Sequence, residues 1–248
     1  MATAGLLAAC GQEPQGPAAK GAEAKAVEAG YMTPPAVLSS QGNEVGVVLQ
    51  GQAPARARVR LATPQGAATQ AEADAQGRWT LLLPPSGEAR IFGLSAQAGA
   101  RAVQGEGYVV VTSRGEAVLL RAGAGALRIG AQGVPRFTTF DFDRDGGAVA
   151  SGLAPAGEVV SVRVDGGQTA EARADAAGRF TVSFNQPLAD GPHQLRAFVR
   201  ADEFTAAVDA TSAGPLSAGP FRATAVAGGL RVDWMTPGGG VQSTVIFQ

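Results

Sequence analysis

Apolar and polar residues alternate along short stretches of this chain, which is the period of a β-strand with one buried face. In residues 56–61 the arginines share one face, and the apolar residues Val59 and Leu61 share the other. No long window has the period of an amphipathic helix. The pattern therefore predicts an all-β protein, with further strands at residues 79–83, 91–96, 108–112, 117–121 and 194–199.

The chain also matches itself when it is shifted by 101 residues. Residues 51–55 (GQAPA) then fall on 152–156 (GLAPA), and residues 73–80 (ADAQGRWT) fall on 174–181 (ADAAGRFT), with no gap between the two blocks. An internal repeat of this length indicates a whole domain present twice. We expect two β-sandwich domains, residues 36–142 and 143–248.

The repeat predicts which strand face is buried. Trp79 maps onto Phe180, so each module has one large aromatic residue on the inward face. The other inward residues stay apolar across the shift and the outward residues change freely: Val59 and Leu61 map onto Val160 and Val162, whereas Arg58 and Arg60 map onto Val159 and Ser161.

Turn residues join the predicted strands. Asp74 opens a four-residue segment that ends at Gly77, and Asp175 and Gly178 repeat it. Aspartate at the first position accepts backbone N–H bonds, and glycine at the fourth permits positive φ, so we expect a tight turn in which these carboxylates have no catalytic role.

The end of each module is predicted from a second similarity. Residues 125–129 resemble 228–232, and a strand follows each, at 134–142 and at 241–247; residues 236–240 (TPGGG) are typical of a hairpin turn. Many short strands, frequent turns and no helix predict two tandem antiparallel immunoglobulin-like sandwiches. A closed barrel of the same strands is the alternative.

Composition limits the classes of partner. The chain has 20 basic and 21 acidic residues, a net charge of −1, so its overall charge does not predict binding to nucleic acid or to an anionic membrane surface. The single cysteine, Cys10, lies outside both repeats. The modules therefore have no internal disulfide and depend on apolar packing.

Residues 7–10 (LAAC) resemble the lipobox of bacterial lipoproteins. That resemblance implies a partial lipoprotein signal at residues 1–10 and a lipid on Cys10, and Gly11 in the next position favours the outer membrane. No Lys or Arg precedes the apolar run, and an ordinary N-terminus is the alternative. Residues 11–35 are rich in Pro, Gly and Gln with few large apolar side chains, so we predict a flexible tether.

Few residues suggest catalysis. The only histidine, His193, takes the place of Phe92 in the shifted alignment, at an apolar strand end. A single histidine leaves no two-histidine metal site, and the chain has no nucleophile elbow, P-loop, HExxH or CxxC motif. We therefore expect no enzyme; scattered carboxylates are the remaining route to one.

One acidic cluster lies at the predicted domain boundary. Asp141, Asp143 and Asp145 alternate and are followed by glycine, like the opening half of a calcium-binding loop. The twelfth position, where such a loop needs a glutamate, is Gly152. The cluster predicts either a calcium site that stiffens the hinge or a solvated acidic linker; no other cofactor is expected.

The repeated segments GxAPA and ADAxGR, and residues 187–195 (PLADGPHQL), resemble bacterial immunoglobulin-like repeats of surface proteins and are similar to transthyretin-like regulatory modules of carboxypeptidases. These resemblances imply a spacer, adhesion or accessory binding role. They lead us to expect a non-enzymatic, lipid-anchored envelope protein with an unknown protein or glycan partner. A carbohydrate- or peptidoglycan-binding module is the alternative, and Trp234 is a candidate ligand contact only if its strand face is exposed.

Overall fold

The computed structural model describes residues 32–248, so the predicted signal, Cys10 and most of the predicted tether lie outside the described residues. Every regular element from residue 32 onward is a β-strand, and all pairings are antiparallel, which confirms the all-β prediction. Among these residues there is no helix with the length and apolar character to cross a membrane.

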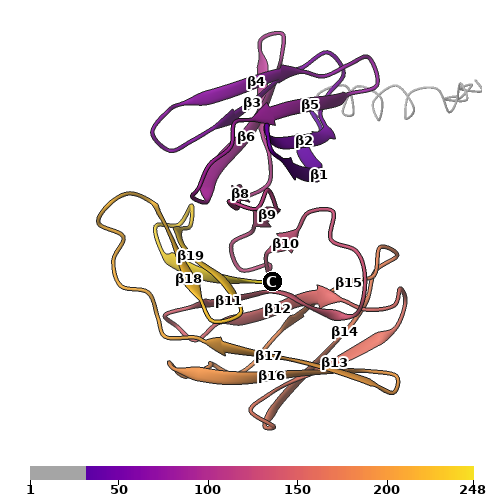
Figure 1. Ribbon diagram of the computed structural model, residues 1–248, viewed down its shortest axis with the longest axis vertical. Helices are drawn as coiled ribbons and strands as arrows, with labels where there is room; N and C mark the ends of the chain where they lie inside the picture. Colours follow the sequence, from indigo (N-terminus) through magenta and orange to yellow (C-terminus); the bar gives the residue numbers. More distant parts are fainter. Residues whose placement is uncertain (1–31) are drawn as a thin grey trace, which may run out of the picture. The chain divides into compact units, whose positions relative to one another are not determined.

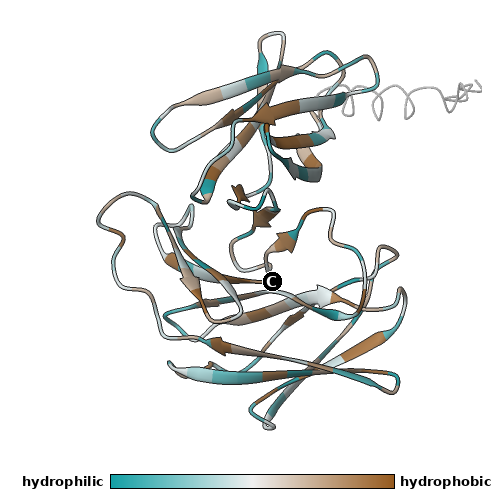
Figure 2. Cartoon of the chain, viewed as in Figure 1, coloured by the Kyte–Doolittle hydropathy of each residue, from teal (hydrophilic) through white to brown (hydrophobic). Residues whose placement is uncertain are grey.

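The first module is a sandwich of two sheets (Figure 1). One sheet has the order β1-β2-β5 and the other contains the order β4-β3-β6-β7. Hydrophobic and hydrophilic residues alternate along the strands (Figure 2). The apolar side chains fill the space between the sheets, and Val59 and Trp79 are almost fully buried there. The strands are β1 (Ala36–Asn43), β2 (Gly46–Gln52), β3 (Arg58–Ala62), β4 (Ala68–Glu72), β5 (Arg78–Leu83), β6 (Arg90–Ala98) and β7 (Arg101–Gln104).

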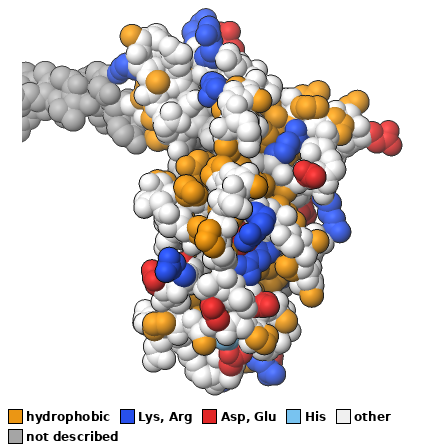
Figure 3. Space-filling model, turned by 90° about the vertical axis from the view of Figure 1, so that its left-hand side faces the viewer, with side chains coloured by type: hydrophobic (Ala, Val, Ile, Leu, Met, Phe, Trp, Pro, Cys, Tyr) orange, Lys and Arg blue, Asp and Glu red, His pale blue; other side chains and the backbone are white. Residues whose placement is uncertain are grey.

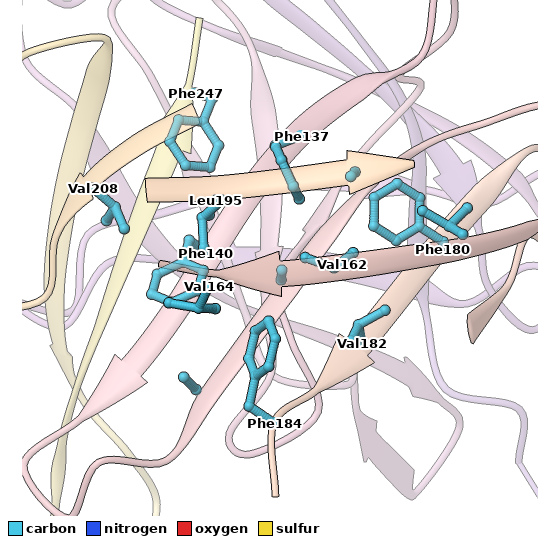
Figure 4. Close-up of a cluster of buried hydrophobic side chains, with 14 of the residues drawn as sticks. Phe137, Phe140, Val162, Val164, Phe180, Val182, Phe184, Leu195, Val208 and Phe247 are labelled. Carbon is cyan, nitrogen blue, oxygen red and sulfur yellow. The ribbon is translucent and has the colours of Figure 1, made fainter. Parts of the chain in front are cut away.

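The second module repeats this arrangement in the orders β15-β12-β11 and β14-β13-β16-β17. Its core is rich in phenylalanine, and Figure 4 shows Phe137, Phe140, Phe180, Phe184 and Phe247 pointing into the same space. The strands are β11 (Arg136–Asp143), β12 (Ala148–Leu153), β13 (Val159–Val164), β14 (Gln168–Arg173), β15 (Arg179–Ser183), β16 (Pro192–Val199) and β17 (Asp202–Asp209).

The repeat found in the sequence is also a repeat of hydrogen-bond register. Gly51 lies opposite Trp79, and Gly152 lies opposite Phe180. Both modules have an irregularity at the same place in their first strand, after Val37 and after Phe137. The predicted inward residues are buried in both copies: Val59 and Val160 are each 0% exposed. This strand order is that of an immunoglobulin-like sandwich.

Each module has three further strands that have no equivalent in the other module. In the first module, β8 (Tyr108–Val111) pairs with the start of β6 and continues into β9 (Ala117–Leu120) and β10 (Leu127–Arg128). In the second, β18 (Phe221–Val226), β19 (Gly229–Met235) and β20 (Val241–Phe247) form a meander. Strand β20 pairs with β11, so this sheet has six strands.

The predicted boundary between residues 142 and 143 falls inside β11. Strand β11 pairs with β12 on one side and β20 on the other, so its residues belong to the six-stranded sheet of the second module. The sequence suggests this boundary because the strand pattern at residues 134–142 follows residues 125–129, just as the pattern at 241–247 follows residues 228–232. An apolar strand pattern does not, however, specify which sheet the strand joins.

Candidate functional site: the joint between the modules

A third apolar core packs the extra strands of the two modules against each other, and we call this contact the joint. Ile91, Val110, Val118 and Leu120 come from the first module and pack against Val232, Trp234 and Ile246 of the second. The rings of Tyr108 and Trp234 form a T-shaped pair, with centroids 6.0 Å apart and an interplanar angle of 77°, a favourable geometry for aromatic residues. Residues 34–248 accordingly form one compact unit.

A loop of the first module, residues 121–126, carries the polar part of the joint. Arg121 fixes its shape by donating from Nε to the carbonyl of Gly125 (2.9 Å) and from Nη2 to that of Ala124 (3.1 Å). The carbonyl of Ala126 accepts from Oγ1 of Thr139 on β11 (2.9 Å). Gly125 and Ala126 at the end of this loop are buried. Buried backbone groups must be paired, and here strands of the second module supply part of that pairing.

Asp141 is the centre of this polar contact. It is 1% exposed, and its carboxylate accepts hydrogen bonds from the backbone N–H of Ala126 (2.7 Å), from Nε2 of Gln242 (3.2 Å) and from the hydroxyl of Thr244 (2.6 Å). The hydroxyl of Thr244 in turn accepts from the indole N–H of Trp234 (3.2 Å). One carboxylate thus ties the 121–126 loop to β11 and β20.

Burial raises the pKa of Asp141 from 3.8 to about 6, although the hydrogen bonds from Ala126, Thr244 and Gln242 and the charge of Arg121 act in the opposite direction. The side chain makes no ion pair among the described residues. Its charge is therefore stabilised mainly by hydrogen bonds, with the charge of Arg121 nearby but not in contact, an energetically costly arrangement in an interior. The joint is thus sensitive to the protonation of this single group.

A second carboxylate holds the meander together. Asp233 on β19 accepts from Arg231 (2.8 Å), from the hydroxyl of Ser243 (2.7 Å) and from Arg222 (2.6 Å). Burial acts to raise its pKa, but these three donors outweigh burial and hold the pKa below its usual range. This network connects β18, β19 and β20, and Arg231 also donates to the carbonyl of Thr211 (2.8 Å).

The three aspartates of the predicted calcium loop do not converge. The carboxylate of Asp141 is buried in the joint, while Oδ1 of Asp143 accepts from the N–H groups of Asp145 (2.9 Å) and Gly147 (3.0 Å) and caps its own turn. Asp145 is exposed. From residue 32 onward, no three His, Cys, Asp or Glu side chains are close enough to share a metal ion.

His193 lies at the start of β16 with both ring nitrogens bonded. Nδ1 is 2.6 Å from Oδ2 of Asp165, and Nε2 is 2.8 Å from the carbonyl of Ala189. The predicted equivalence with Phe92 is wrong: β13 pairs Val162 with Ala197 where β3 pairs Leu61 with Leu94, so β16 is displaced relative to the uniform shift. The longer loop before β16 causes this displacement, and His193 takes the place of Arg90.

The aromatic residues considered for a sugar-binding face are buried. Trp79 and Phe180 are each 2% exposed and lie in the cores of their modules, and Trp234 is 1% exposed in the joint. The prediction that Trp79 and Phe180 face inward is confirmed, and the strand face of Trp234 is covered, so this residue is no ligand contact. Figure 3 shows a surface of scattered apolar and charged side chains with no continuous apolar strip on the face in view.

Sequence reasoning missed Ala126, Gln242 and Thr244 as parts of the joint. The available signal was the polar run Gln242-Ser243-Thr244 inside an otherwise apolar strand. Those three residues are 7%, 2% and 0% exposed. Buried polar residues at consecutive positions indicate that both faces of the strand are covered, because successive side chains point to opposite sides.

Comparisons with known proteins found no matching family model and no matching curated protein. Among solved structures, the BSP domain of a biofilm associated protein is 14% identical, with a TM-score of 0.26, and the match covers 75% of this chain and 30% of that one. Invasin, a bacterial integrin-binding protein, is 12% identical with a TM-score of 0.24, and the match covers 88% of this chain and 54% of that one. The chicken interferon gamma receptor alpha chain is 10% identical with a TM-score of 0.25, and the match covers 73% of this chain and 100% of that one.

This chain thus spans about a third of the biofilm protein and about half of invasin. Similarities of this size transfer no function. The assignment of an immunoglobulin-like fold rests instead on the strand order and register of the two modules.

Proposed function

We propose that this protein is a non-enzymatic structural or protein-binding component of the bacterial cell envelope. The observation that carries the proposal is the joint: a third core and a buried hydrogen-bond network connect two sandwiches into one unit. Modules that share only a linker move independently. Modules joined by a buried core present their surfaces at a fixed spacing, which suits a spacer or a display scaffold.

The lipid anchor is the second part of the proposal. The lipobox-like residues 7–10 support attachment through a lipid on Cys10, with the outer membrane as the destination. A lipid on Cys10 followed by a tether would hold the sandwiches near the membrane and leave their faces free for a partner.

Two experiments test the two parts separately. In a bacterial host, labelled palmitate should enter the wild-type protein, and Cys10→Ser should lose the label and move from the membrane to the soluble fraction. Persistence of the Cys10→Ser variant in the membrane fraction contradicts the anchor. For the scaffold role, we expect cross-linking in intact envelopes to capture a defined protein or glycan partner; the partner should be lost when the joint is disrupted by Trp234→Ala.

The carbohydrate- or peptidoglycan-binding alternative lacks the support of an exposed aromatic platform, because Trp79, Phe180 and Trp234 are buried. A different feature, a row of arginines on the first module, supports a version of it.

A further inference from the structure

A row of three exposed arginines follows strand β3 of the first module. Arg58 and Arg60 occupy alternate positions of β3, so their side chains leave the same outward face, and Arg56 precedes them in a turn with a φ of 56°. None of the three side chains makes a hydrogen bond or an ion pair with another described residue, although their backbones are paired in the turn and the strand ladder. Other arginines of the chain, such as Arg179 and Arg200, are bonded to carboxylates.

The surroundings of the row are polar and shallow. Arg56 and Arg58 border an open hollow of about 530 Å³, together with the amides of Gln70 and Gln97 and the carboxylate of Glu72. Arg58 lies between Glu72 on β4 and Gln97 on β6, and Arg60 lies between Gln70 and Ser95. The face thus offers guanidinium groups without a side-chain partner among the described residues, flanked by amide and hydroxyl groups and by one carboxylate, that of Glu72.

The second module is an internal control for what the fold requires. At the equivalent positions it has Gly157, Val159 and Ser161, in a strand with the same pairing to its neighbour β14. The sandwich therefore forms without arginine at these positions. The arginines of the first module are free to serve a purpose other than folding.

The two modules also differ in charge, which the net charge of the whole chain conceals. Residues 34–135 contain nine arginines and six acidic residues, a balance of +3, whereas residues 136–248 contain nine arginines and twelve acidic residues, a balance of −3. An anionic ligand would be attracted to the first module and repelled by the second.

The spacing and neighbours of the arginines specify the class of ligand. Alternate residues of a strand are about 6.6 Å apart, so the row matches an extended chain with repeated negative groups. Guanidinium groups bind carboxylate and sulfate in a bidentate manner, and the flanking amides suit hydroxyl groups. The outward positions of β3, β4 and β6 have no aromatic residue on which nucleic-acid bases stack.

We propose that this face of the first module binds an acidic polysaccharide, with Arg56, Arg58 and Arg60 contacting its carboxylate or sulfate groups. The inference rests on the proposed role as a non-enzymatic binding module and names the chemistry of its partner. It does not depend on the lipid anchor, because the proposed ligand-binding groups all lie on β3, its preceding turn and the neighbouring strands β4 and β6.

The test uses the full chain and compares acidic with neutral polymers by titration calorimetry. Polygalacturonate supplies carboxylates, heparin supplies sulfates, and dextran is the neutral control; the first two arms distinguish the source of the charge. We expect binding to at least one acidic polymer, weakening as salt is added, and no binding to dextran.

The decisive variant carries Arg56→Gly, Arg58→Val and Arg60→Ser, which are the residues of the second module. We expect affinity to fall by more than about tenfold while the melting temperature is retained. A control variant with Arg173→Ser, Arg196→Ser and Arg200→Ser removes the same charge from the second module and should bind as the wild type does. If the first variant does not fold, Arg56→Gln, Arg58→Gln and Arg60→Gln replaces it.

Three outcomes overturn the proposal: no binding to either acidic polymer, equal loss in both arginine variants, or tighter binding to duplex DNA or to anionic phospholipid vesicles than to either polysaccharide. Membrane fractionation of the Arg56→Gly, Arg58→Val and Arg60→Ser variant should match the wild type. A failure of glycan binding is thereby separated from a failure of the envelope anchor.

Discussion

Gly125 of the first module lies directly against Val149 of the second. A β-carbon on Gly125 would stand 2.7 Å from Cγ1 of Val149, and 3.0 Å from both Oγ of Ser151 and Cγ2 of Thr181. These are the outward residues of β12 and β15, which the 121–126 loop covers. In the first module the equivalent outward residues, Gln50 and Thr80, are exposed. The contact of this loop is therefore what distinguishes the two copies of the same sheet.

The first prediction concerns this contact. Gly125→Ala should destabilise the protein for two reasons, since φ at Gly125 is +77° and the added methyl group has no space. Gly123→Ala is the matched control: its φ is +69°, but nothing lies within 4 Å of a β-carbon there. In urea unfolding, we expect Gly123→Ala to cost about 1 kcal/mol and Gly125→Ala about 1–3 kcal/mol more. Equal losses would show that the loop does not pack tightly on β12.

The second prediction concerns the pH dependence contributed by Asp141. Its pKa is about 6 in the folded protein and 3.8 as a free side chain. The folded state therefore binds the proton more tightly than the unfolded state does. As pH rises from about 4 to about 6, the contribution of this group to the free energy of unfolding is progressively lost. The change amounts to about 3 kcal/mol at neutral pH, from about 1.4 kcal/mol per pKa unit.

Asp141→Asn isolates that contribution because it removes the titration at nearly constant volume. We expect the free energy of unfolding of the wild type, minus that of the variant, to fall by about 3 kcal/mol between about pH 4 and about pH 7. Chemical denaturation across this range measures it. A flat difference for Asp141→Asn would mean that its carboxylate is not desolvated in solution.

The third prediction uses the single histidine of the chain. Burial acts to lower the pKa of His193, but its bonds to Asp165 and to the carbonyl of Ala189, with the charge of Asp209, outweigh burial and raise it. Both ring partners are acceptors, so both bonds form only with the imidazolium. The stabilisation is complete below pH 6.5 and is lost as pH rises through the folded pKa.

Proton NMR of the imidazole measures this directly, since no other histidine contributes signals. We expect the pKa of His193 to lie above 6.5 and to decrease in Asp165→Asn, which removes the 2.6 Å ion pair. Asp190→Asn is the control, because Asp190 bonds to Ser212 and not to the ring. An unchanged pKa in Asp165→Asn would contradict the ion pair.

Much of each sandwich could be predicted from the sequence, because local rules and the repeat agree. The turn at Asp74 is as expected: Oδ1 accepts from the N–H groups of Gln76 and Arg78, both at 2.9 Å, and φ at Gly77 is +80°. Asp175 repeats this arrangement with Ala177 and Arg179. Residues close in sequence decide such turns, and the period-two pattern decides which side chains are buried.

The joint could not be predicted in the same way. The pairing of β20 with β11 connects Thr244 with Asp141, which are far apart in the sequence, and the first copy of the repeat contains no equivalent contact, because β1 is an edge strand. Alternation predicts one buried face, but both faces of β11 are covered: Phe140 faces the module core and Asp141 faces the 121–126 loop. An acidic residue at such a position is indistinguishable from a solvated linker until the covering loop is known.

The last prediction concerns calcium at the Asp141 cluster. A calcium ion in proteins takes six to eight oxygen ligands, but the carboxylate of Asp141 already accepts three hydrogen bonds in the joint, and Oδ1 of Asp143 caps its turn. We therefore expect millimolar calcium to leave the melting temperature unchanged, with magnesium as the control for ionic strength. A saturable rise with calcium, absent from the Asp143→Asn, Asp145→Asn double variant, would show instead that the turn rearranges to bind the ion.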